Sequence, residues 1–361
     1  MILPVIFLSL PFLLVELHIP HATYLSYLII ILFTLVYGSK IQISNYPGIV
    51  SAYIILIITS LFRIDQYSIF MLLDVGLLIV GCLPFLFCSR FKVNAKTLNI
   101  VLIILFFLSY GNSLFSVHVD TESLMNSDIG LESMYLSFVI PLFAVYWYEK
   151  KQKKLCLINF FLGIVAGKRI VMLATILALL LMKFFRDKEK KQSIVLLTLE
   201  LSAIILSILV VIAFVEGYFD GIIYEWTGLP ADHFTMGRKT LYSFVIGGQD
   251  NFTMWGIGMG NTKELLMMGR LHNDILRIYV ENGALVFFVF FFVMLKNVEL
   301  RDLPYYLYIL IVFLTDNTLI YAPIQVIYIL FISRRKHFEE DTYIINPQKL
   351  VKPNIPISSI T

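Results

Sequence analysis

The residues most able to do chemistry lie together in the segment 256–283. His272 precedes Asn273, and Arg277 and Glu281 follow that asparagine at helical spacing, so the last three form one polar stripe. A histidine here could act as a general base, because its side chain titrates near neutral pH. The structural alternative is that Asn273 caps the helix while Arg277 and Glu281 neutralise each other.

Further basic groups in the chain could bind an anion. Lys168 and Arg169 stand between two short apolar segments, where helix 170–186 is expected to begin. The backbone amides and dipole of a helix N-terminus favour a phosphate. Arg238 opens a semi-apolar segment that could lie on the membrane surface. The alternatives are that Lys168 and Arg169 only mark a helix end and that Arg238 is a solvated loop residue.

Glycines, histidines and cysteines give no sign of a classical cofactor or metal site. The glycines between 247 and 260 lack the strand–turn–helix context and the lysine of a phosphate-binding loop. We expect them to let the backbone turn sharply and approach another segment closely. The six histidines form no His-x-x-x-His pair, and the three cysteines lie in apolar runs. We therefore expect no metal, no cofactor and no disulfide framework.

The composition indicates which elements must position these residues. The chain of 361 residues is 59% hydrophobic and only 15% charged, with a mean hydropathy of +0.84. Apolar runs reach membrane-spanning length repeatedly and do not alternate with a period of two, so the pattern predicts an all-α integral membrane protein. The first run lacks a basic start and a cleavage site, and we expect it to be a span rather than a signal peptide.

Lys and Arg cluster at alternate turns, as the positive-inside rule predicts for cytoplasmic loops. Taking the cluster at 150–154 as cytoplasmic puts the N-terminus inside. The predicted helices up to this cluster are 2–17, 22–37, 46–62, 69–88, 97–117 and 131–148. The next basic cluster is at 183–191, so the intervening residues form either one long helix or a hairpin around Gly167. The hairpin keeps both clusters inside, and we favour it.

The hairpin leads to about twelve transmembrane helices with both termini cytoplasmic. Helix 193–215 then exits into a large outer loop at 216–274, helix 275–295 returns, and 304–332 forms a last hairpin around Asp316 and Asn317. Residues 1–336 would be a single membrane domain. We expect the cytoplasmic tail at 337–361 to be mobile.

These features resemble the O-antigen polymerase and O-antigen ligase superfamily of bacterial inner-membrane proteins. The resemblance covers roughly 160–295, and the first 150 residues are similar only in hydropathy. The matching pieces occur in the family's order, with a large periplasmic loop between late helices. They are Gly167-Lys168-Arg169, Gly237-Arg238, Gly256-x-Gly258-x-Gly260, His272-Asn273 and Glu281-Asn282-Gly283.

The resemblance implies a metal-independent glycosyltransferase on the periplasmic face of the bacterial inner membrane, without a cofactor. It would join undecaprenyl-diphosphate-linked repeat units of O-antigen or capsule, using a lipid-linked donor and acceptor. By similarity, Arg169 and Arg238 would hold the diphosphate. His272 would activate the acceptor hydroxyl, and Glu281 would orient or replace it. Lys168, Arg270, Asn273 and Arg277 would bind substrate.

Other functions remain open at the level of sequence. A ligase would transfer the glycan to lipid A core, and it shares the same motifs. A flippase for lipid-linked oligosaccharides would carry charges through both halves of the bundle, whereas the spans among the first six helices contain little besides Glu16 and Asp74. A chain-length regulator and a separate flippase are expected partners of a polymerase, and nucleic acid is not.

Overall fold

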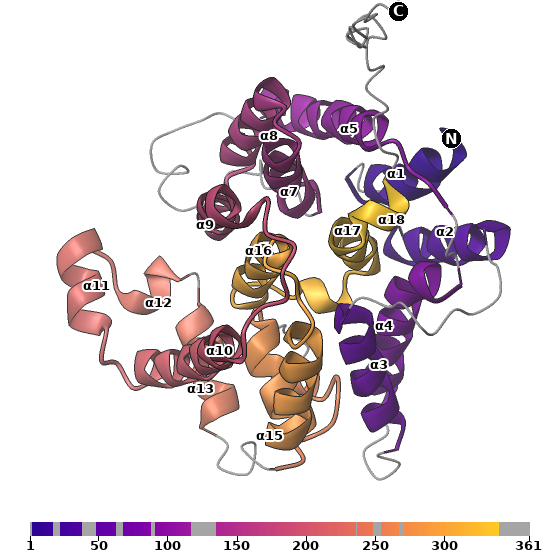
Figure 1. The fold of residues 1–361 in the computed structure, drawn as a ribbon. Helices are drawn as coiled ribbons and strands as arrows, with labels where there is room; N and C mark the ends of the chain where they lie inside the picture. The colour runs from indigo at the N-terminus through magenta and orange to yellow at the C-terminus, as the bar shows by residue number, and fades with distance from the viewer. Residues whose placement is uncertain are drawn as a thin grey trace, which may run out of the picture.

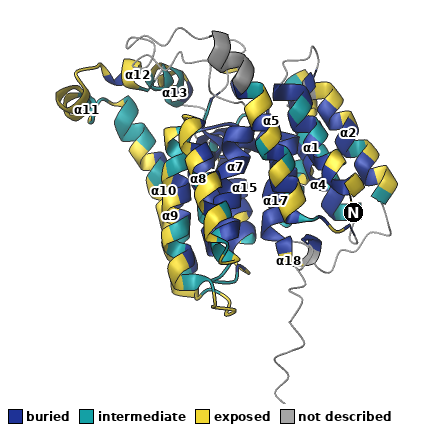
Figure 2. Cartoon of the chain, turned by 90° about the horizontal axis from the view of Figure 1, so that it is seen from above, coloured by how far each residue is buried: buried dark blue, intermediate teal, exposed yellow. Residues whose placement is uncertain are grey.

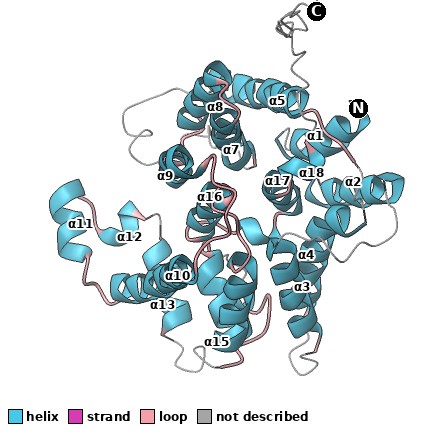
Figure 3. Ribbon diagram, in the orientation of Figure 1, coloured by secondary structure: helices cyan, strands magenta, loops and turns pink. Residues whose placement is uncertain are grey.

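A computed structural model describes residues 2–16, 22–37, 48–62, 68–87, 91–116, 135–235, 237–247, 254–266 and 271–338. This part of the chain consists of helices joined by loops and turns, with two isolated backbone bridges and no strand (Figure 3). Within its first half the helices are α1 (Ile2–Glu16), α2 (Ala22–Tyr37), α3 (Gly48–Leu61), α4 (Ile69–Phe87), α5 (Ala95–Ser116), α7 (Leu136–Glu149), α8 (Lys153–Val165) and α9 (Arg169–Phe185). These helices follow the ranges predicted from the apolar runs.

The second half contains two helices of 22 residues, α10 and α15, together with shorter ones. Its elements are α10 (Ile194–Val215), α11 (Asp220–Thr227), α12 (Ala231–Phe234), α13 (Arg238–Ile246), α14 (Thr262–Leu265), α15 (Asp274–Leu295), α16 (Leu303–Phe313), the 3-10 turn η4 (Thr318–Ile320), α17 (Ala322–Ile332) and α18 (Arg334–His337). The segment predicted as a large outer loop therefore contains four short helices. Each of the four has at most nine residues.

Three of the described helices, α4, α10 and α15, are long and apolar enough to cross a membrane. Seven shorter helices are also apolar, and α17 is apolar on every side, which is typical of a helix enclosed by other helices. It lies near the middle of the bundle, and all its residues are buried (Figures 1 and 2). By contrast, only 17% of an apolar 18-residue stretch of α10 is buried. The all-helical membrane class predicted from composition agrees with these helices.

Ion pairs and backbone bridges gather the basic loops at one end of the bundle. Arg334 Nε lies 2.7 Å from Glu149 Oε2, which joins the end of α7 to the start of α18. Arg335 pairs with Asp302 before α16, and Lys191 bridges to Glu299. We call this end the basic end. Figure 2 shows α18 there, with α11, α12 and α13 at the opposite end.

The hairpin at Gly167 and the start of the C-terminal tail were both predicted from the sequence. Between the basic clusters the chain forms two helices, α8 and α9, that turn at Gly167, as the hairpin alternative predicts. The tail was expected to be mobile from residue 337, and for its first two residues this is wrong. His337 and Phe338 are buried, and the His337 ring stacks on Phe91 at a centroid distance of 4.3 Å. The remainder of the predicted tail lies outside the described residues.

Candidate functional site

His272 lies immediately before α15, at the end of the bundle opposite the basic end. Its φ of 46° is in the left-handed region, which is unusual for a residue other than glycine. Its side chain is 41% exposed, and its Nδ1 lies 3.8 Å from Oδ1 of Asp316. Nδ1 thus faces the carboxylate, and Nε2 lies on the other side of the ring. Asn273 caps α15, since its Oδ1 accepts a hydrogen bond from the amide of Leu276 at 2.8 Å.

Asp316 also belongs to this site, although its sequence context predicted only a turn. It comes from the turn between α16 and η4, and its Oδ2 lies 3.3 Å from Nζ of Lys168. Its Oδ1 also accepts the backbone amide of Asn317 at 2.8 Å. Burial raises the pKa of Asp316, but the nearby His272 and the charge of Lys168 outweigh this and lower the pKa to about 2. The carboxylate is therefore ionised at neutral pH and holds His272 and Lys168 at one place.

The α13 helix closes another side of the same site. The hydroxyl of Tyr242 donates a hydrogen bond of 3.2 Å to the backbone oxygen of His272. Burial raises the pKa of Tyr242, and the positive charge of Arg238 opposes that rise. Arg238 is the first residue of α13 and lies one helical turn before Tyr242, so both are on the same face.

The start of α9 approaches His272 through Lys168, since both residues lie next to Asp316. The Lys168 ammonium lies 4.4 Å from the ring centroid of Phe138 and contacts Asp316, whereas Arg169 is exposed at the first position of α9. Arg169 is thus adjacent in the chain to the site residue Lys168 and is exposed. Arg270, the remaining predicted phosphate ligand, lies outside the described residues.

Arg277 and Glu281 belong to a second, buried cluster. Arg277 Nε lies 3.0 Å from Glu281 Oε2, and another nitrogen of its guanidinium pairs with Asp74 of α4. Lys263 Nζ lies 2.6 Å from the other oxygen of Asp74, and Thr262 donates a hydrogen bond to Glu281. The side chains of Arg277, Asp74 and Glu281 are at most 3% exposed. Two acids and two bases balance, as the neutralisation alternative predicts, with Asp74 as an added partner.

The contacts of this second cluster hold the Glu281 carboxylate away from His272. Both oxygens of Glu281 are engaged by Arg277 and Thr262, and the carboxylate beside His272 is that of Asp316. From the sequence, Asp316 was expected only as part of a hairpin turn. The available signal was a charged residue between two apolar helices, where an unpaired charge is costly.

The glycine-rich loop supports α15 where that helix is broken. Gly283 has φ 81° and ψ 169°, and this break frees carbonyl oxygens one turn earlier. The amides of Ile257 and Gly258 donate to the oxygens of Val280 and Glu281 at 2.9 and 2.8 Å. A Cβ on Gly283 would overlap the backbone oxygen of Met254. The glycines thus allow the loop backbone and the α15 backbone to approach closely, as expected from the sequence. The two backbones are then joined by hydrogen bonds.

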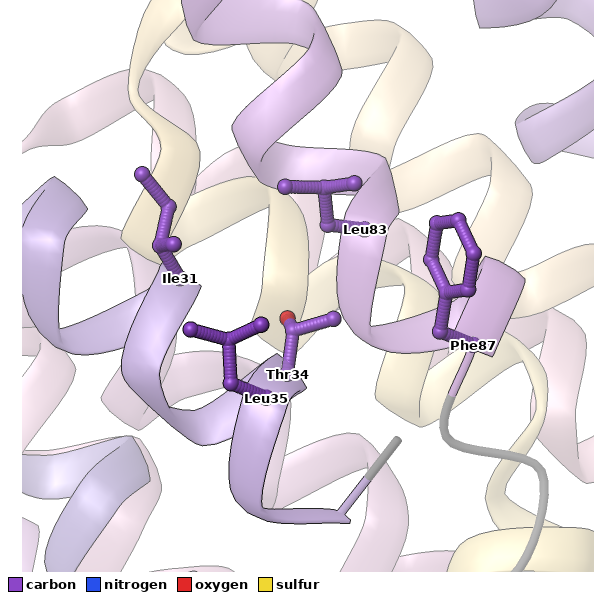
Figure 4. Close-up of a pocket in the computed structure, with 5 residues that line it drawn as sticks. All are labelled: Ile31, Thr34, Leu35, Leu83 and Phe87. Carbon is purple, nitrogen blue, oxygen red and sulfur yellow. The ribbon is translucent and has the colours of Figure 1, made fainter. Parts of the chain in front are cut away.

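An apolar groove between α2 and α4 lies apart from these groups. Its lining consists of Ile31, Thr34, Leu35, Leu83 and Phe87 (Figure 4). These residues occupy the halves of α2 and α4 that lead to the basic end, and no titratable side chain lines the groove. It therefore has no group that could serve as a general base or bind a diphosphate. Within the described part of the chain, no group of three or more His, Cys, Asp or Glu side chains is arranged to hold a metal ion.

Comparison with known proteins adds no relative: no family model, curated protein or solved structure matches this chain. The class that the helices define is an all-helical, apolar protein of membrane type. The site at the end opposite the basic end combines His272, the Asp316 carboxylate and the Lys168 ammonium, beside the helix that begins at Arg238.

Proposed function

We propose that the chain is a glycosyltransferase that polymerises undecaprenyl-diphosphate-linked repeat units at the outer face of a bacterial inner membrane. The observation that carries the proposal is the convergence of Lys168, Asp316 and His272 from three separate parts of the chain. They lie beside α13, which begins at Arg238 and reaches the His272 backbone through Tyr242. A histidine oriented by a carboxylate suits proton abstraction from a hydroxyl. Fixed cations suit a diphosphate leaving group.

The proposed topology has twelve spans: α1 to α5, α7 to α10 and α15 to α17. The basic end faces the cytoplasm under the positive-inside rule, with both termini on that side. The His272 site then lies at the periplasmic surface, where a lipid-borne diphosphate would meet it. The predicted loop 216–274 contributes α13 and the glycine-rich loop to this surface.

In the proposed reaction, Nε2 of His272 takes the proton of the acceptor hydroxyl. The acceptor oxygen forms a bond to the anomeric carbon of the donor sugar. The bond between that carbon and the diphosphate oxygen breaks, and its electron pair leaves on the undecaprenyl diphosphate. Lys168, Arg169 and Arg238 would stabilise that charge, and Asp316 would orient the imidazole and stabilise its protonated form.

The test is surface glycan length in the native host after single substitutions. For His272→Ala we expect glycans of one repeat unit, because a positioned general base contributes about 10²- to 10⁴-fold in rate. Arg238→Ala and Arg169→Ala should also shorten the chains. His233→Ala is the matched control, since His233 is an exposed histidine on α12 at the same end, and its glycans should keep their full length.

Three outcomes would contradict the proposal. Normal long chains in the His272, Arg169 and Arg238 variants would remove the site assignment. Long lipid-linked chains that fail to reach lipid A core would indicate a ligase. Loss of all periplasmic lipid-linked intermediate would indicate a flippase.

A further inference from the structure

The short helix α11 turns its apolar side away from the protein. Ile222 and Trp226 lie one helical turn apart and are 54% and 86% exposed. On a different side of the helix, Asp220 pairs with Lys239 of α13, with Nζ and Oδ2 2.5 Å apart. No residue of α11 is buried. In water this arrangement is unfavourable, because an isolated helix of eight residues is not stable and gains nothing from an exposed apolar face.

The position of α11 indicates what covers this face. It follows α10 across the left-handed Gly217, and α10 is among the helices apolar enough to span a membrane. Figure 2 shows α11 extending sideways from the end of α10, beyond the bundle. A helix that leaves a span at this point and runs sideways meets the bilayer surface.

The aromatic residues around α11 fit the same environment. Tyr218, Tyr224 and Trp226 are 77%, 61% and 86% exposed. Tyr and Trp concentrate at membrane–water interfaces, where the ring is partly apolar and the polar group stays hydrated. Asp220 lies on the opposite side of the helix from Ile222 and Trp226, where it pairs with Lys239.

We propose that α11 is an interfacial membrane anchor whose Ile222 and Trp226 insert among lipids at the surface reached by the outer end of α10. The ion pair between Asp220 and Lys239 then ties α13 to the lipid surface. Because Arg238 precedes Lys239, its guanidinium is held near the depth of lipid headgroups. The anchor rests on the geometry of α11 and not on glycosyl transfer.

The test measures the depth of Trp226 in vesicles of phosphatidylcholine and phosphatidylglycerol. The full chain and its Trp226→Phe variant are compared, so that the difference in emission reports Trp226 while Trp147 and Trp255 are unchanged. The substituted side chain is 86% exposed, which keeps the fold intact. Phosphatidylcholine brominated near the headgroup should quench the difference signal more than phosphatidylcholine brominated near the chain end. Aqueous iodide should quench it weakly.

Other results would overturn the anchor. Strong quenching by iodide without quenching by brominated lipid would put the helix in water. Protection from both quenchers that disappears when the protein is diluted in lipid would mean that a second copy of the chain covers it. The quenching assay tests the anchor, and the glycan assay tests the proposed glycosyl transfer. Glycan length in the Trp226→Phe strain therefore does not change how the quenching result is interpreted.

Discussion

Replacing Asp74 with Asn tests the reasoning about the buried ion cluster. The substitution keeps the size of the side chain and removes one negative charge from a residue that is fully buried. Arg277, 3% exposed, then keeps only Glu281, and Lys263, 16% exposed, loses its carboxylate. Breaking a buried pair by removing one partner costs about 3–5 kcal/mol, because a charge is left without compensation. We expect the free energy of unfolding to fall by about that amount.

The assay is reversible unfolding in mixed detergent micelles, followed by circular dichroism. Asp187→Asn is the matched control, since the Asp187 side chain is 81% exposed and pairs with Arg186 at 3.6 Å. Its substitution should cost less than about 1 kcal/mol. The double variant Asp74→Asn with Arg277→Gln should lose less free energy of unfolding than the two single variants lose together, because the remaining Lys263 and Glu281 charges balance. Equal stability of Asp74→Asn and the parent chain would refute the buried cluster.

The other predictions use the same unfolding measurement. Gly283→Ala should lower the free energy of unfolding by more than about 1 kcal/mol, because of the positive φ and the clash with Met254. The control Gly76→Ala has open space around its Cβ and should be neutral or slightly stabilising. Equal effects of the two substitutions would contradict the close approach at Gly283. Because the pKa of Asp316 is lowered to about 2, its carboxylate should stabilise the fold by about 2 kcal/mol above about pH 4. This contribution should be lost as the pH falls towards 2, and Asp316→Asn should abolish the loss. Asn273→Ala should cost about 1 kcal/mol by removing the cap of α15, and an unchanged value would argue against the cap.

Much of the helical layout could be predicted from sequence because it depends on local composition. Long apolar runs bounded by charged turns gave the ranges of the first helices. The basic clusters also distinguished a hairpin at Gly167 from one long helix. The short helices of the outer segment were missed, except that Arg238 was expected to open a semi-apolar helix. Such helices lack long apolar runs, and their limits depend on turns and caps.

The site was predictable only in part, because its contacts join distant parts of the chain. His272 was selected from its type and its place before a helix. Lys168 and Arg169 are adjacent, and the sequence does not indicate which one faces the bundle. The carboxylate beside His272 was assigned to Glu281, which is near in sequence, while packing brings Asp316 instead. The polar stripe of Arg277 and Glu281 was identified, but its partner on α4 depends on tertiary packing.

The break at Gly283 has a consequence for the order in which the protein assembles. The carbonyl oxygens of Val280 and Glu281 are bonded by amides of a loop that precedes α15 in the chain. Hydrocarbon offers no substitute donor for these oxygens. The α15 helix can therefore reach its final form only after the preceding loop has folded back against it. Docking of that loop would act as a checkpoint for completing the bundle.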